Sequence, residues 1–104
     1  MFNNFTVGIW NRGPSTKVNG VTIPGVLAWV RDANIDLQPY STALLLRQYG
    51  YSIEVNKRIF MDFDIDIKIG TVFYYTNPQE ILEKYEVKTI INWSYLELAC
   101  LGVV

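Results

Sequence analysis

Three aspartates stand at alternate positions of the stretch RIFMDFDIDIKIG: Asp62, Asp64 and Asp66. Neighbouring carboxylates can bind a cation or take part in acid–base chemistry. A calcium loop also begins D-x-D-x-D, but it needs glycine at its sixth position and a bidentate glutamate at its twelfth. Here those positions hold Ile67 and Phe73. The calcium-loop motif therefore fails at both.

The same spacing is typical of a half-buried strand, whose side chains alternate between two faces. Asp62, Asp64 and Asp66 would share one face with Lys68, opposite an apolar row: Met61, Phe63, Ile65, Ile67 and Ile69. One unbroken strand over residues 51–69 would exceed the usual length of about 3 to 10 residues. Because aspartate tolerates turn geometry, we expect a bend within the aspartate run. In either arrangement we expect solvated carboxylates, with no metal and no catalytic role.

The remaining side chains offer little for catalysis. The chain has no histidine, the commonest general base and zinc ligand, and one cysteine, which cannot build a metal cluster or an internal disulfide. Cys100 lies in LELACLGVV, which predicts a small buried apolar side chain. A chain with a single cysteine favours a reducing compartment. NRGPST lacks the spacing and lysine of a phosphate-binding loop. We expect no enzymatic activity and no cofactor.

Composition indicates a subunit of an assembly. The 104 residues suffice for one domain, spanning 1–104, yet 50% are hydrophobic, 14% aromatic and only 18% charged. A body this small buries a modest share of its surface, so part of the apolar load should remain exposed as contact surface. We therefore expect an obligate oligomer or a component of a larger particle.

Charge and hydropathy exclude other classes. The net charge of −1 gives no general attraction to nucleic acid or anionic lipid. Apolar runs such as VLAWV are far shorter than the ~20 residues of a membrane span. MFNNFTVGIW lacks the basic and apolar regions of a signal peptide. We expect no membrane partner and assembly in the cytoplasm.

Single-stranded nucleic acid binding is an alternative, because small barrels with exposed aromatic residues have this function. Lys57, Arg58, Phe60, Tyr74 and Tyr75 are the candidates. Adjacent Lys57 and Arg58 would face opposite sides of a strand, and no wider basic stripe accompanies them. A hairpin end with core aromatic residues is the favoured interpretation.

The fold prediction is all-β, a small antiparallel barrel or sandwich of about five to six strands. Strands are expected over 5–10, 21–40, 51–63, 70–76 and 84–104, the last range holding one or two. Pro24 and Gly25 predict an edge, bulge or bend. Residues 11–20 are expected to be a loop, and residues 77–82 a loop or brief helical turn. STALLLRQYG, residues 41–50, contains helix formers and ends in glycine, which predicts one short helical turn or a mobile loop.

Three stretches resemble the small minor capsid or head-completion proteins of tailed phages: Val30–Ser41, Tyr49–Thr71 and Tyr85–Trp93. In that family an extended segment ending in Gln-Pro precedes a variable loop. A strand pair with an Asp and a Lys-x-Gly turn follows, then a strand with a Tyr-x-Val start and a Trp. The matching residues here are Gln38, Pro39, Asp62, Lys68, Gly70, Tyr85, Val87 and Trp93.

The resemblance implies a small antiparallel β-barrel that forms a homo-oligomeric ring in the virion neck, sealing the portal after DNA packaging. It implies a portal or adaptor protein on one side and tail proteins on the other. DNA would pass through the channel without sequence-specific binding. The resemblance also places a turn around Asp62, Asp64, Asp66 and Gly70. A tail-side joining or terminator protein is the runner-up within the same assembly.

In such stoppers a loop between early barrel strands can enter the channel. By position this loop is Tyr40–Gly50, and its candidate channel or inter-subunit residues are Tyr40, Leu44, Leu45, Leu46, Arg47, Tyr49 and Gly50. Gly50 is a possible hinge. The loop is short for a plug, which favours lining the channel over blocking it.

Overall fold

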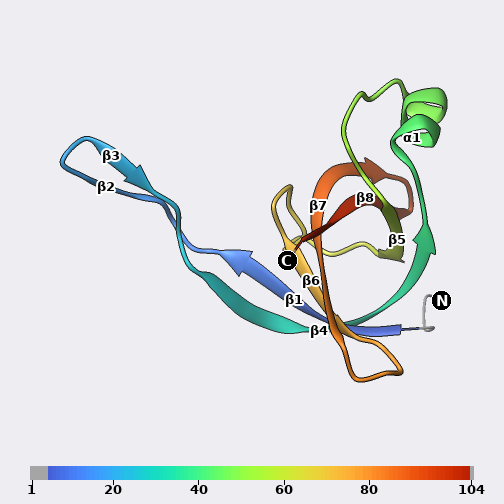
Figure 1. Cartoon of the computed structure of the whole chain (residues 1–104), viewed down its shortest axis with the longest axis horizontal. Coiled ribbons are helices and arrows are strands. Elements are labelled where there is room, and N and C mark those ends of the chain that lie inside the picture. Colours follow the sequence, from blue (N-terminus) through green and yellow to red (C-terminus); the bar gives the residue numbers. More distant parts are fainter. Residues whose placement is uncertain (1–4, 104) are drawn as a thin grey trace.

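The computed structural model describes residues 5–103 and shows an antiparallel barrel closed by six strands (Figure 1). Their order around the barrel is β1-β4-β5-β8-β7-β6, and β6 pairs back onto β1. The bounds are β1 Phe5–Arg12, β4 Leu27–Pro39, β5 Lys57–Asp62, β6 Val72–Thr76, β7 Leu82–Asn92 and β8 Tyr95–Val103. The predicted small all-β barrel is confirmed. The predicted last strand included Val104, which lies outside the described residues, as do the first four residues of the N-terminal stretch.

The barrel core consists of alternate residues from every strand, as the pleat requires. Phe73 and Leu98 are fully buried, and Tyr85 is almost so. The other buried residues of this cluster are Val7, Ile9, Ile35, Ile59, Met61, Ile67, Val87, Leu96 and Cys100. Burial raises the pKa of the Cys100 thiol, as expected of an inert core cysteine.

Residues 13–26 form an arm that projects from the barrel between β1 and β4 (Figure 1). Its strands β2 (Thr16–Val18) and β3 (Val21–Ile23) are joined by Asn19 and Gly20, whose φ angles are +51° and +78°. Positive φ at both central residues is the geometry of a tight hairpin turn. The prediction of a plain loop over residues 11–20 was therefore wrong, because the chain continues as β1 and then pairs as a hairpin. The single strand predicted over 21–40 was wrong, because residues 24–26, which include Pro24 and Gly25, interrupt it between β3 and β4.

Residues 42–49 form one helix, α1 (Thr42–Tyr49), so the predicted helical turn is confirmed. Ser41 caps its first turn by accepting a hydrogen bond from the Leu44 amide at 3.1 Å, and Gly50 ends it with φ +78°. The strand predicted over 51–63 was wrong in its first half, because residues 51–56 are not in a strand, and of these only Asn56 continues the pairing, its amide donating to the Cys100 carbonyl of β8 at 2.9 Å. They run instead from α1 back to β5.

The β5–β6 connection, residues 63–71, is here called the cap loop. It contains turns at residues 65–66 and 69–70, with Gly70 at φ +96°. Asn11 holds the loop to β1 by donating to the Asp66 carbonyl at 2.8 Å and accepting from the Thr71 hydroxyl at 2.5 Å. Ile67 is buried, whereas Phe63, Ile65 and Ile69 are exposed, so the predicted strand alternation does not extend through this segment.

Candidate functional site

The predicted channel loop is a helix fixed to the outer surface of the barrel. Tyr40 and Leu45 are buried in a second apolar cluster with Val55 and Ala99. Their side chains therefore attach α1 to the barrel and are not free to meet a neighbour. Of the other candidate residues, Leu44, Leu46, Arg47 and Gly50 are exposed, and Tyr49 is partly buried.

A buried carboxylate lies beneath α1. Glu97, only 4% exposed, accepts hydrogen bonds from the Tyr49 hydroxyl at 2.9 Å and the Trp93 indole at 3.3 Å. Its other oxygen lies 3.7 Å from a guanidinium nitrogen of Arg58. Burial, followed by the hydrogen bond to Glu97, raises the pKa of Tyr49 to about 12. The contacts hold the helix in place and present no reactive group to solvent.

The predicted nucleic-acid residues do not form one surface. Arg58 lies on the outer face of β5, within 4.7 Å of the Tyr40 ring centre and 5.0 Å of the Phe60 ring centre, and it donates to Gln38. Tyr75 packs edge-on against Phe5 beside the core. Arg58 is thus occupied by contacts within the chain.

The aspartates of the cap loop are partly withdrawn from solvent, so the prediction of solvated carboxylates was wrong for Asp64. Arg31 from β4 pairs with Asp64 and, at 2.6 Å, with Asp66. The Asp64 side chain is 12% exposed, whereas Asp62 at the end of β5 is exposed. These contacts give two of the three aspartates a structural role in closing the cap loop. Among residues 5–103, no cluster of three or more His, Cys, Asp or Glu side chains could hold a metal ion.

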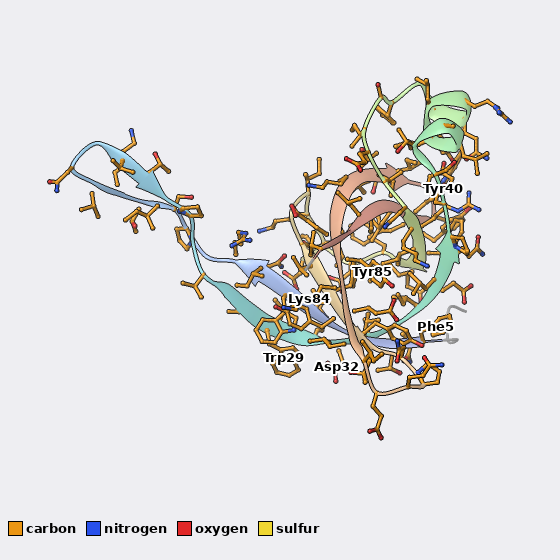
Figure 2. The ribbon with its side chains drawn as sticks, viewed as in Figure 1. Phe5, Trp29, Asp32, Tyr40, Lys84 and Tyr85 are labelled. Carbon is orange, nitrogen blue, oxygen red and sulfur yellow. The ribbon has the colours of Figure 1, made fainter. Side chains whose placement is uncertain are left out.

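A hollow lies on the outer surface of β1, β4 and β6. Its volume is about 310 Å³, and the residues that line it are Thr6, Val7, Gly8, Trp10, Trp29, Asp32, Tyr74, Thr76 and Leu82. Trp10 stacks on Tyr74 with ring centres 4.6 Å apart, and Lys84 lies 5.2 Å from the Tyr74 ring centre. In Figure 2, Trp29, Asp32 and Lys84 lie together, whereas Tyr40 lies near α1.

The shape of this hollow depends on Gly8. A Cβ atom there would lie 3.2 Å from the Trp10 indole nitrogen and 3.6 Å from both Trp29 and Asp32. The Trp29 indole donates to Asp32 at 3.1 Å, which orients its ring. Glycine therefore provides the open floor between two tryptophans.

Sequence reasoning identified Tyr74 but missed Trp10, Trp29 and Lys84. A register shift between Ile9 and Trp10 leaves out Val30 and pairs Trp10 with Trp29, so that Trp29 joins Trp10 on the outer face. A bulge of this kind has no signal in the spacing of the residues. The only indication in the sequence was that Trp10 and Trp29 fall in predicted strands and had no assigned place in the core.

The arm is the second unusual surface. Every residue of β2 and β3 is exposed, and the exposed apolar side chains are Val18, Val21, Ile23 and Val26. Val26 is 83% exposed, although it is aliphatic. Soluble proteins seldom leave such groups together in water unless a partner covers them.

No protein-family model matches the chain, and no curated protein matches it. In the part of the chain that is described, no helix is long and apolar enough to cross a membrane.

Proposed function

We propose that this chain is a structural protein of a tailed-phage neck, where copies form a ring that completes the head and joins it to the tail. One observation carries the proposal: a closed barrel that projects an arm with four exposed aliphatic residues. Apolar surface on a separate projection is suited to holding a neighbouring subunit. The resemblance to head-completion proteins supplies the particular assembly.

Further support comes from electrostatics. Exiting DNA would be slowed by each phosphate contact in a strongly basic channel, and the chain has a net charge of only −1. On this proposal the partners are other copies, a portal or adaptor protein, and tail proteins. A tail-side joining or terminator role would use the same ring and the same arm.

The test is electron microscopy of a lysate from the parent phage carrying an early stop codon in this gene. We expect separate tails beside heads that are empty or leaking, and joined particles when the intact gene is supplied from a plasmid. Intact, infectious particles from the stop-codon phage would refute the proposal.

In this proposal α1 faces the channel with Leu44 and Leu46, the exposed leucines of the helix. Because Leu45 is buried, deleting the helix would also remove part of the second apolar cluster. The sharper variant is Leu44→Ser with Leu46→Ser, which changes only exposed side chains. We expect filled heads that leak DNA, seen as empty heads in aged lysates, and heads that keep their DNA would contradict a channel role.

The aromatic hollow favours a second candidate, single-stranded nucleic acid binding. Trp29 is 57% exposed, and Lys84 flanks the Trp10–Tyr74 stack, so stacking and one phosphate contact are available together. Titration with an oligothymidylate would show salt-dependent quenching of tryptophan fluorescence, lost on Trp29→Ser and reduced on Lys84→Ala. Lys57→Ala is the control, since Lys57 does not line the hollow.

A further inference from the structure

The arm cannot bury its apolar side chains within its own chain. β2 and β3 pair with each other in a separate two-stranded sheet. Figure 1 shows them projecting away from the barrel. A two-stranded hairpin is at best marginally stable in water, and its stability rises when a third surface packs against it. The cover for Val18, Val21, Ile23 and Val26 must therefore come from another molecule.

The charge distribution points to another copy of this chain. Residues 1–31 carry Arg12, Lys17 and Arg31 and no acidic residue, so all ten acidic residues and the other six basic ones lie in residues 32–104. Arg31 is paired with the cap loop, which leaves Arg12 and Lys17 as the charges at the base and on the arm. The arm is thus basic and apolar, and the barrel of a second copy is acidic.

The hollow is a suitable receiving surface. It is concave and aromatic, with Trp29 and Leu82 exposed at 57% and 50%. Tryptophan and tyrosine are among the residues most enriched in interface hot spots, where they form pockets that a partner fills. Lys84 already lies over the Tyr74 ring, so the position suits an aliphatic side chain better than a second cation. Asp32 beside it offers a carboxylate to the basic arm.

We propose that the arm of one copy docks in the hollow of a second copy, placing an aliphatic side chain of the arm against Trp10, Trp29 and Leu82. The two surfaces differ and belong to the same chain, so the contact is heterologous and repeats head to tail. Repeating this contact produces a closed ring when the rotation between successive copies divides a full turn evenly.

This inference deepens the proposed function, since it names the contact that would hold the neck ring together. The two can fail separately. If the arm docks but the stop-codon phage is intact, the contact is real and the neck role is wrong. If the stop-codon phage loses its tails but the arm does not meet the hollow, the ring is held by another surface.

Cysteine cross-linking tests the contact. Full-length chains carrying Val21→Cys on the arm are mixed with tagged chains carrying Leu82→Cys at the hollow, and a short thiol-reactive linker is added. Cys100 is buried and should not react. The control partner carries Leu44→Cys on α1, where the residue is 38% exposed. We expect a mixed dimer with the hollow and not with the helix.

The yield of mixed dimer can support the inference or overturn it. Trp29→Ser in the hollow-bearing chain should lower the yield of mixed dimer about tenfold, as expected for an interface hot spot. Equal yields at Leu82→Cys and Leu44→Cys, or no mixed dimer at the highest attainable concentration, would overturn the inference. Saturable oligothymidylate binding at Trp29 that blocks the cross-link would assign the hollow to nucleic acid and would also overturn it.

Discussion

At the scale of single residues, Glu97 is the buried charged group that joins α1 to the barrel. Its carboxylate is buried beneath α1, and it connects the helix residue Tyr49 with Trp93 and Arg58 of the barrel. One of its oxygens and the Nε atom of Arg58 are buried without a hydrogen bond. Removing one member of such a pair leaves the other desolvated and uncompensated.

Glu97→Ala should therefore lower the free energy of unfolding by about 3 kcal/mol. Glu97→Gln keeps an acceptor for Tyr49 and Trp93, so its cost should be about 1 kcal/mol. Urea denaturation of both variants beside the unaltered protein measures the difference. Equal costs would mean that the charge, and not the acceptor, is the essential property.

The raised pKa of Tyr49 predicts how the stability of the fold changes with pH. Its pKa is raised from the ordinary value of 10.0 to about 12, so folding favours the protonated hydroxyl. Its contribution is complete below pH 10 and is lost as the pH rises from 10 through 12. Burial also raises the pKa of Tyr40, the other tyrosine near Glu97, which adds to the decline.

Tyr49→Phe should be less stable by about 1 kcal/mol at neutral pH, because the bond to Glu97 is lost. The stability difference from the unaltered protein should shrink between pH 10 and 12. Denaturation measured across this range checks the prediction. Tyr51→Phe, at an exposed position, is the matched control.

Residue roles were predictable from the sequence where the neighbours along the chain decide them. LELACLGVV is apolar enough to predict the burial of Cys100, which the structure shows. Asp64 was predicted to be solvated because its partner Arg31 lies 33 positions earlier in the sequence. The hollow was missed for the same reason, because pairing brings Trp10 and Trp29 together.

At the scale of elements, the residues within each segment predicted the helix correctly and the arm wrongly. Ser41 and Gly50 bound an eight-residue helix as caps, so its limits followed from sequence. The arm also has a local signal, since Asn19–Gly20 between Val18 and Val21 is a strong hairpin pattern. It was assigned to a loop because Gly13, Pro14 and Ser15 precede it. The alternation over 51–56 was misleading, because Ile53 and Val55 pack in the cluster beneath α1 and not in a ladder.

The direction of the arm depends on a close contact at its base. A Cβ atom on Gly25 would lie 2.0 Å from the carbonyl oxygen of Gly13 and 2.5 Å from its carbon. A Cβ atom on Gly13 would meet only the Val26 carbonyl, at 4.0 Å. The two glycines thus form a matched pair of sites for substitution.

Gly25→Ala should displace the arm and leave the barrel intact, because the arm shares no ladder with the barrel sheet. Amide chemical shifts of β2 and β3 should change, while the free energy of unfolding should change by less than about 1 kcal/mol. The mixed-dimer yield with the hollow should fall. Gly13→Ala should change neither the arm shifts nor the yield, and a similar effect of both substitutions would contradict this account of the base.

At the scale of the whole molecule, the barrel could be predicted from the sequence, whereas the projecting arm could not. Short strands and frequent turn residues led to a closed all-β body, since a chain of this composition must hide its sheet edges. Composition also predicted exposed apolar surface, but its location on the arm, the cap loop and the hollow depends on strand pairing. The exposed residues Phe63, Ile65 and Ile69 show that the cap loop holds part of that surface.

The separation of charge along the chain predicts that self-association weakens with salt. Lys17 lies on an arm without acidic residues, while the barrel carries all ten acidic residues of the chain. At low ionic strength this attraction acts over about 10 Å or more, and added salt screens it. Analytical ultracentrifugation should therefore show weaker association at about 0.5 M salt than at about 0.05 M salt.

Lys17→Glu should weaken association at low salt, because it gives the arm a negative charge that the acidic barrel repels. Lys68→Glu, on the exposed side of the cap loop, changes the net charge of the chain by the same amount and is the matched control. If net charge alone governed association, both variants would weaken it equally. If the arm is the contact, as its exposed valines and missing carboxylates indicate, only Lys17→Glu will do so.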